Sequence, residues 1–435
     1  MWVRRFISII ILVIAIVGAL IAAGLAPYAL AAWTAHIRLL AAGSVVTFGL
    51  IVLLGAWGSA AVWRTTNTRR AALWIGAVLT GVFALALFVL VLKPFRSTVP
   101  GARPSADTRY WQLSTGSRIA YVECDPPAGV SIKPYPIIYL HGGPGMSQAP
   151  FDKEAYGSFS QDGFRVFLYD QAGSGQSDIL PHLVDYTIPR AVEDLEAIRQ
   201  TIGTDKLILI GHSWGSTLAA SYMAKYPQHV DKVVFHAPGP LWSWDKEVPD
   251  YSRTDSSGKG GFPSPRLIAA ALLLNRNRNA AESLLPQREA QQIMVPMISP
   301  TVGTLVCKGD SAKEPSVIKT FATQQVDPHF NPYVLFALSG ETTKSTGDPH
   351  QTLRGNETAA ILLYPECNYL SWSGAVDYRK TFGDLKIYYI PGAGHFIQFE
   401  QPDLLHAVIR SFLLDQPGPL PPYTSDTDPR TAAHP

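Results

Sequence analysis

The first 106 residues of this 435-residue chain contain no acidic residue, and the first Asp or Glu is Asp107. Uncharged apolar runs fill this segment, at about residues 6–32, 39–63 and 71–92. Each run exceeds the roughly 20 residues that a helix needs to cross a bilayer, and a cleaved signal peptide would not be followed by two further runs. We therefore predict a membrane region over residues 1–96, with three transmembrane helices and the lipid bilayer as a partner. Its fixed charges are Arg4, Arg5, Arg38, Arg64, Arg69, Arg70, Lys93 and Arg96.

These basic residues also predict an orientation in the membrane. Two arginines precede the first run and three lie between the second and third, whereas the first loop has only Arg38. Basic loops stay in the cytoplasm, so three crossings leave the rest of the chain outside it. The basic residues at 93, 96 and 103, after the third run, favour the opposite orientation. We predict a multi-pass membrane protein with an extracytoplasmic C-terminal domain.

Cysteine is scarce, with only Cys124, Cys307 and Cys367. They are too few and too scattered for a disulfide framework, so at most one pair forms and one thiol stays free. No Cys-x-x-Cys motif or His/Cys cluster indicates a metal. Beyond residue 96 the chain has 28 basic residues (36 minus the 8 above) against 34 acidic ones, with no basic stripe interleaved with aromatics. We therefore expect no nucleic acid partner.

Residues 211–215 read Gly-His-Ser-Trp-Gly and are the most informative motif of the chain. The apolar run 206–210 precedes them, and the helix-like segment 216–223 follows. A strand, a sharp turn and a helix in this order form a nucleophile elbow, which holds a serine at the top of a sheet. Glycines flank the serine because a side chain at either position would clash with neighbouring elements. The motif predicts Ser213 as a nucleophile.

Two further loops carry the groups that a serine nucleophile needs. Residues 141–145 (HGGPG) follow a predicted strand, and there the backbone N–H of Gly143 would join that of Trp214 in an oxyanion hole. Residues 391–395 (PGAGH) follow another strand, so His395 is the predicted base that takes the Ser213 proton and returns it. His141 and His212 belong to glycine motifs and are expected to shape them. Because these side chains supply nucleophile and base themselves, no cofactor or metal is expected.

Together, HGGPG at 141–145, DQAGSGQS at 170–177, GHSWGS at 211–216 and GAGH at 392–395 resemble the prolyl aminopeptidase (proline iminopeptidase) family of α/β-hydrolases. The resemblance covers roughly residues 108–415. It implies an α/β fold, a mostly parallel sheet flanked by helices, with a helical cap over the serine. The family pattern has arginine where this chain has Ala172. This difference weakens the assignment of the substrate more than the assignment of the chemistry.

The acid of the expected triad is missing. It should follow the strand predicted at 359–364, where relatives read G-x-x-D, but Asn368 occupies the position, 27 residues before His395. An amide oxygen can orient the imidazole but cannot stabilise the imidazolium with a full charge, and in chymotrypsin the Asp-to-Asn change lowers kcat by about 10⁴-fold. Three interpretations stay open: a working Ser-His-Asn triad, an acid recruited from Glu366, Asp377 or Asp245, or a crippled enzyme.

The resemblance and the composition together predict the domain organisation. The α/β-hydrolase core is expected at residues 105–239 and 356–415, and a cap or lid insertion at 240–355, with a Ser/Gly/Pro-rich hinge at 254–265. Residues 188–202 are expected to form a helix with Asp194 and Glu196 on its solvent side. The last segment, 416–435, is dense in Pro, Thr and Asp and is expected to be a disordered tail.

These features predict a membrane-anchored serine hydrolase that acts by acyl transfer. By resemblance, its substrate is a small peptide with N-terminal proline or another small residue. An esterase or lipase acting on acyl esters is the alternative enzyme, because the membrane brings such substrates close. A weakly active or inactive membrane protein that binds ligands in the cap cleft is the alternative from another class, because of Asn368.

Overall fold

The computed structural model describes residues 2–63, 66–94, 104–148, 150–242, 264–298, 305–307, 330–339 and 348–432. The chain divides into two units. The first joins Met1–Ser97 with Phe262–Ala290 and is called the membrane unit below because its helices are long and apolar enough to cross a membrane. The second, the hydrolase unit, joins Thr98–Gly261 with Gln291–Pro435.

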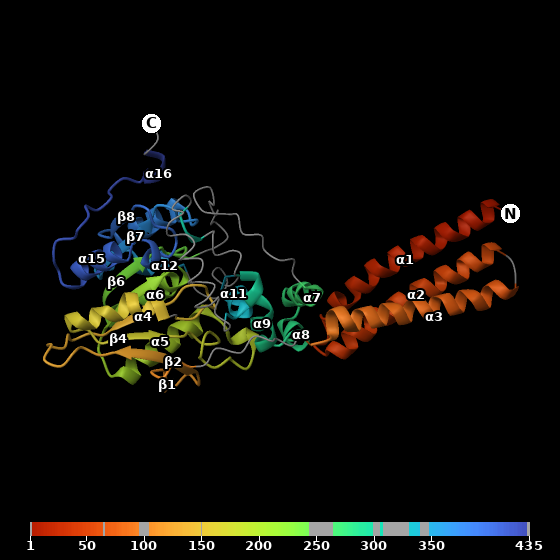
Figure 1. Ribbon diagram of the computed structural model, residues 1–435, viewed down its shortest axis with the longest axis horizontal. Coiled ribbons are helices and arrows are strands. Elements are labelled where there is room, and N and C mark those ends of the chain that lie inside the picture. Colours follow the sequence, from red (N-terminus) through yellow and green to blue (C-terminus); the bar gives the residue numbers. More distant parts are fainter. Residues whose placement is uncertain are drawn as a thin grey trace. The chain divides into compact units, whose positions relative to one another are not determined.

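Three long helices, drawn red to orange in Figure 1, form most of the membrane unit. They are α1 (Trp2–Leu30), α2 (Ile37–Trp63) and α3 (Thr66–Leu87), which continues into the short π-helix η1 (Phe88–Leu92). All three are long and apolar enough to cross a membrane, as the sequence predicted. Helices α1 and α2 pack closely because Gly55 faces Ala15, where any Cβ would overlap. Ser8 and Ser59 also bond each other's backbone carbonyl reciprocally, at 3.1 and 3.0 Å.

The expected cap does not behave as one insertion. Its helices α7 (Pro265–Leu274) and α8 (Arg278–Leu284) belong to the membrane unit, not to the hydrolase unit. The reason lies in the composition of α7, whose sequence PRLIAAALLL is apolar and packs against α1 and η1. The next helix, α9 (Gln287–Ile298), begins as the chain returns to the hydrolase unit, which also holds α11 (Pro332–Ser339) and α12 (Pro349–Leu353). Most of the predicted hinge, residues 254–263, lies outside the described residues.

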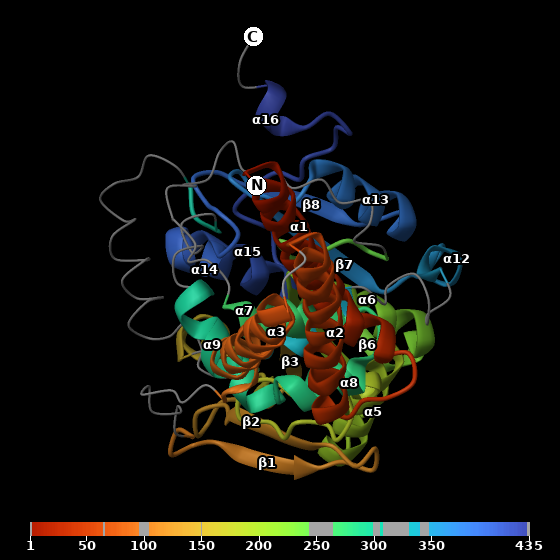
Figure 2. The same cartoon turned by 90° about the vertical axis from the view of Figure 1, so that its right-hand side faces the viewer.

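An eight-stranded sheet in the order β1-β2-β4-β3-β5-β6-β7-β8 is the centre of the hydrolase unit. The pairs β1–β2 and β2–β4 are antiparallel, and all others are parallel. Strand β1 lies at one edge and β8 at the other (Figure 2). The strands predicted before residues 141, 211 and 391 and at 359–364 are confirmed as β3, β5, β8 and β7. The eight strands are β1 Arg109–Gln112, β2 Arg118–Cys124, β3 Ile137–Leu140, β4 Val166–Tyr169, β5 Leu207–His212, β6 Val230–His236, β7 Ala359–Pro365 and β8 Lys386–Ile390.

Helices cover both faces of this sheet because its strands are apolar on both sides. On one face, alternate residues such as Ile208 and Ile210 pack with α4 (Pro150–Gly157) and α15 (Pro402–Leu413). On the other, Phe235 contacts the rings of Tyr378 and Phe382 in α13 (Trp372–Phe382). Helices α5 (Ile188–Ile202) and α6 (Trp214–Lys225) pack against each other, and α6 contacts β3, β5 and β6.

Two acidic residues of α5 were expected on its solvent side, which is wrong. Asp194 is buried and accepts hydrogen bonds from Ser117 and Arg190. Glu196 is buried too, and its carboxylate accepts from Arg199 and from the hydroxyl of Tyr222. Both carboxylates are tolerated in the interior because each is paired and hydrogen-bonded.

The expected disordered tail is also wrong for residues 416–432. Tyr423 N donates to Ile387 O at 2.7 Å, so this segment adds an antiparallel bridge to β8. Trp372 Nε1 donates to Asp426 O at 2.8 Å, and the described part of this segment closes with the short helix α16 (Pro429–Ala432). Arg430 is only 7% exposed. A segment with low apolar content is ordered here because its backbone carbonyls and Arg430 find specific partners on the hydrolase unit.

Candidate active site

Ser213 lies at the turn between β5 and α6 in a strained conformation, with φ 54° and ψ −119°. Non-glycine residues rarely adopt positive φ, and such strain is common at functional sites. The flanking glycines are required, as predicted: a Cβ on Gly215 would overlap the carbonyl oxygen of Leu140, and one on Gly211 would lie 2.5 Å from the carbonyl oxygen of Gly215. The serine is thereby fixed at the carboxyl end of a buried strand.

The loop after β3 lies directly against this turn. A Cβ on Gly142 would come within 3.1 Å of both Ser213 Cβ and His212 Nδ1. Gly143 has φ +120°, and a Cβ there would lie 2.8 Å from the amide nitrogens of Gly145 and Met146. Trp214 is the first residue of α6, so its N–H has no partner within the helix. The two predicted oxyanion donors therefore belong to loops that meet at Ser213.

Gln171 connects these two loops, a role that the sequence did not reveal. Its backbone N–H donates to His141 Nε2 at 2.9 Å, and its side-chain amide donates to His141 O at 3.0 Å. Its Oε1 accepts from Trp214 Nε1 at 3.0 Å. The only available signal was its position in the motif at 170–177, because the contacts are made between distant loops.

His395 follows β8 on a buried loop and is hydrogen-bonded to Asn368. The distance from His395 Nδ1 to Asn368 Oδ1 is 2.9 Å. An amide oxygen only accepts, so Nδ1 carries the proton and Nε2 keeps its lone pair. His212, the neighbour of Ser213, contacts His395 with its ring (centroids 5.0 Å apart) and with Nε2, which is 3.1 Å from His395 O. The structure thus brings Ser213, His395, Asn368 and the HGGPG loop to one place.

The alternative acids have other partners. Glu366 Oε2 accepts from the backbone N–H of Gly392 at 2.9 Å. Asp377 lies on α13 and pairs with His350 Nε2 at 2.9 Å. Asp245 lies outside the described residues. The residue whose side chain bonds His395 Nδ1 is Asn368, at the position where the sequence predicted the triad's third member.

Burial controls the protonation of the histidines at this site. The pKa of His395 is held well below its ordinary value by burial and, to a lesser extent, by His212. Burial also lowers the pKa values of His141 and His212 to about 4. These rings are therefore neutral near pH 7, which a general base requires and which leaves His141 and His212 as structural groups.

The buried carboxylate of Glu400 and a disulfide hold the segments on either side of the His395 loop in place. Glu400 accepts from Cys307 N at 2.9 Å with Oε1 and from Gly394 N at 2.6 Å with Oε2. Leu305 O accepts from His395 N at 2.8 Å. Cys307 forms a disulfide with Cys367, next to Asn368, and Cys124 stays free, so one pair forms as the sequence allowed.

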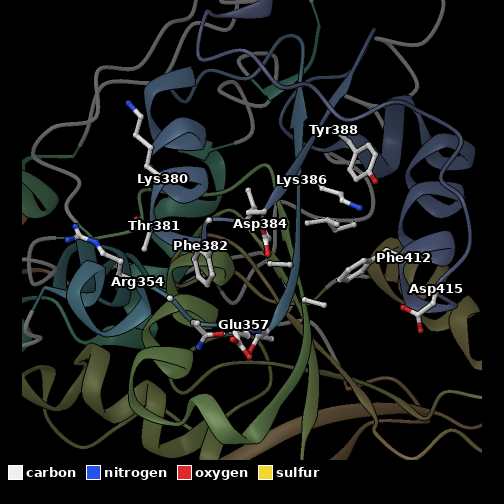
Figure 3. A pocket seen from close by; sticks show the side chains of 18 of the residues that line it. Arg354, Glu357, Lys380, Thr381, Phe382, Asp384, Lys386, Tyr388, Phe412 and Asp415 are labelled. Atoms are coloured by element: carbon white, nitrogen blue, oxygen red, sulfur yellow. Dashed lines mark hydrogen bonds between the residues drawn. The ribbon is translucent and has the colours of Figure 1, made fainter.

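A cavity lies at the end of the sheet opposite to Ser213. It has a volume of about 1040 Å³ and is lined by residues at the amino ends of β7 and β8, including Ala359 and Lys386. Figure 3 shows Arg354, Glu357, Lys380 and Asp384 around it. Strands β5, β6, β7 and β8 are all parallel, so their carboxyl ends lie at the same edge of the sheet. Ser213 follows the carboxyl end of β5, whereas the cavity lies at the amino ends of β7 and β8. The cavity is therefore not part of the candidate active site.

The sequence of the hydrolase unit resembles known hydrolases. A sequence model of the alpha/beta hydrolase fold matches residues 135–402. A proline iminopeptidase from Heyndrickxia coagulans is 38% identical over 136 residues, which cover 31% of this chain and 45% of that protein. One from Neisseria gonorrhoeae is 38% identical over 125 residues, covering 29% and 38%. The chain thus spans less than half the length of these curated relatives.

The solved structures agree on the fold. An esterase from Thermogutta terrifontis superposes with a TM-score of 0.51 at 19% identity, covering 71% of this chain and 99% of that one. An esterase from a Rhodococcus species superposes with a TM-score of 0.50 at 17% identity, covering 72% and 100%. The fold and the prolyl aminopeptidase-like resemblance that the motifs predicted are confirmed.

Proposed function

Because this chain belongs to the alpha/beta hydrolase fold family, we propose that it is a serine hydrolase that works by acyl transfer through Ser213. The observation that carries the proposal is the strained Ser213 turn, packed against the HGGPG loop and against His212, which contacts His395.

In this mechanism Ser213 Oγ attacks the substrate carbonyl carbon while His395 Nε2 takes its proton. The N–H groups of Gly143 and Trp214 stabilise the resulting oxyanion. The tetrahedral intermediate collapses as the protonated His395 returns that proton to the leaving amine or alcohol. Water then attacks the acyl-enzyme while His395 takes a proton from it. The second tetrahedral intermediate collapses by breaking the bond to Ser213 Oγ, which receives that proton from His395, and the acid product leaves.

Asn368 sets the expected rate of this reaction. Its Oδ1 accepts from His395 Nδ1 at 2.9 Å, so it selects the tautomer that a base needs. It carries no charge to stabilise the imidazolium, and burial opposes that charge further. We therefore propose a working but slow Ser-His-Asn triad, which uses the third residue to orient the ring.

The proposed substrate is a short peptide with N-terminal proline or another small residue. Its support is the similarity to proline iminopeptidases, which are 38% identical over 136 and 125 residues. An acyl ester is the alternative substrate, and ligand binding without turnover is the alternative function.

We further propose that the three apolar helices anchor the enzyme in a membrane with the hydrolase unit outside the cytoplasm. The distribution of arginines supports this orientation. The Cys307–Cys367 disulfide supports it independently, because disulfides persist in oxidising compartments and are rare in the cytosol.

Labelling with a fluorophosphonate tests the proposal directly. The full chain in detergent micelles should form an adduct that peptide mapping places on Ser213, and Ser213→Ala should not. Turnover of proline p-nitroanilide and of p-nitrophenyl butyrate then separates peptidase from esterase. A folded wild-type protein that gives no adduct would instead be a binding protein.

A further inference from the structure

The membrane unit contains an apolar cavity of about 350 Å³ at one end of its helix bundle. The cavity is lined by the last turns of α1, the first turns of α2, the end of α3 with η1, and helices α7 and α8. Among the described lining residues only Tyr28 and Ser44 have polar side-chain atoms, and Ser44 Oγ already donates to Ala23 O at 2.7 Å. Such a lining suits a hydrocarbon chain.

Three cations lie next to residues that line this cavity. The Arg276 guanidinium lies 5.8 Å from the ring centre of Tyr28, which lines the cavity. Arg38 and Lys93 directly follow the lining residues Ile37 and Leu92, and all three cations are exposed. The membrane unit has two acidic residues: Glu289 is paired with Arg266, and Glu282 is half-buried and accepts from Gln287 Nε2 at 2.8 Å. The exposed charged residues named above are therefore all positive, and the lining of the cavity is apolar.

We propose that this cavity binds one acyl chain of an anionic membrane lipid, with the lipid phosphate held by Arg38, Lys93 and Arg276. The volume lies within the roughly 300–1,000 Å³ of small-molecule sites. Clusters of Lys and Arg at the membrane surface attract anionic lipid headgroups. A lipid in this site would also contact α7, a helix that lies between β6 and β7 in the sequence.

Photocrosslinking tests this site. The full chain is reconstituted in nanodiscs with phosphatidylglycerol that carries a diazirine near the end of one acyl chain, and adducts are mapped by mass spectrometry. Adducts should fall on cavity residues of α1, α2 and α7, and Leu272→Trp, which fills the cavity, should remove them. Arg38→Gln and Arg276→Gln should each lower labelling about fivefold.

Arg70→Gln is the matched control. Arg70 is exposed on the same bundle but precedes Phe83 of the cavity by 13 residues, about 20 Å of helix, and should leave labelling unchanged. Equal labelling by a phosphatidylcholine probe, or adducts spread over the bundle, would show ordinary surrounding lipid and overturn the proposal.

A second observation, in the hydrolase unit, concerns Arg430 of the C-terminal segment. Arg430 Nη1 donates to the carbonyl oxygen of Asn368 at 3.1 Å, and Arg430 Nη2 binds Asp428 at 2.7 Å. Its guanidinium also lies 5.6 Å from the ring centre of Tyr364, at the end of β7. A buried arginine from the chain end thus holds the loop that presents Asn368 to His395.

We infer that Arg430 is a positioning residue for the triad, an inference that rests on the proposed function. Without it the Asn368 loop loses a buried charge-assisted hydrogen bond, and the bond from Asn368 Oδ1 to His395 Nδ1 loses its fixed geometry. The C-terminal segment then acts as a strap across the back of the active site.

The test compares Arg430→Met with Arg379→Met. Arg379 binds the same segment through Tyr423 O and Ser425 O (3.1 and 2.8 Å) but has no hydrogen bond to Asn368 among the described residues. Arg430→Met should lower the rate of fluorophosphonate labelling about tenfold. It should also shift the acidic limb of the pH profile and speed hydrogen exchange in residues 366–372, whereas Arg379→Met should do neither and Arg430→Lys should restore part of the rate.

The outcomes separate the positioning role of Arg430 from the proposed hydrolase function. If wild type is labelled on Ser213 and Arg430→Met matches it in rate and pH profile, the positioning role is wrong and the hydrolase function stands. If wild type is not labelled at all, the proposed function fails, and the positioning role fails with it.

Discussion

Asn368 Oδ1 lies 2.9 Å from His395 Nδ1, in the position of a triad acid but without a charge. Asn368 Nδ2 is buried and has no hydrogen-bond partner in the described part of the chain. The side chain of Asn368 is therefore bound through Oδ1, which also lies 3.4 Å from Leu370 N.

Asn368→Asp should raise kcat by at least about tenfold, since the reverse change in chymotrypsin costs about 10⁴-fold. The carboxylate stabilises the imidazolium, so the pKa of His395 rises and the acidic limb of the pH–rate profile moves to higher pH. Steady-state hydrolysis between pH 4.5 and 8 measures both effects. A loss of activity at every pH would contradict the proposed role of Asn368.

The buried histidines predict how stability depends on pH. The pKa values of His141 and His212 are about 4 in the folded chain and ordinary, near 6.5, when unfolded. The unfolded chain therefore binds more protons as pH falls below 6.5, and the folded state loses stability, by roughly 3 kcal/mol per histidine at pH 4.

Thermal unfolding of the full chain in detergent, followed between pH 7.5 and 5, measures this loss before most carboxylates titrate. The melting temperature should fall steadily below pH 6.5. Replacing the exposed His182 by Asn should leave the slope unchanged. A flat curve would mean that the two histidines are not buried as neutral rings.

Gly215→Ala should disrupt the nucleophile turn. The new methyl would overlap Leu140 O, a backbone atom of β3 that cannot move away, so the cost is about 3 kcal/mol or more. Melting temperature and fluorophosphonate labelling should both drop. Gly18→Ala is the matched change, because no atom lies within 4 Å of a Cβ there, and it should have little effect on either.

Removing the Cys307–Cys367 disulfide should weaken both stability and activity. The bond closes a segment with a sequence separation of 60, which corresponds to about 4 kcal/mol in the chain-entropy view. Labelling of Ser213 should slow, because the disulfide joins residues 305–307, which bond the backbone N–H of His395, to the loop that carries Asn368. The double Cys307→Ser/Cys367→Ser variant is compared with Cys124→Ser, the free thiol. Identical behaviour of the two would rule out a role for the disulfide.

The strands, the Ser213 turn and the partners of His395 could be predicted because each depends on a local pattern. Apolar runs give β5 and β8, and glycines mark the turns that follow them. Asn368 was identified from spacing alone, and its bond to His395 matches that reading.

The rest depended on contacts between distant residues. Gln171 and Glu400 act through loops that only the fold brings together. The segment 416–432 has the composition of a disordered tail, yet it is ordered by Arg379, Trp372 and the buried Arg430. Likewise, nothing in the sequence of α5 reveals that Ser117 and Tyr222 will meet its carboxylates.

In the membrane topology proposed above, the division of the chain bears on release of the hydrolase unit from a cell. Residues 262–290 belong to the membrane unit although hydrolase segments precede and follow them, so the backbone crosses between the two units three times. A protease that severs the linker after the third span cuts only one of these crossings. Ectodomain shedding by a single nick would therefore fail, and a freely diffusing form would need at least two further cuts, both inside the cap insertion.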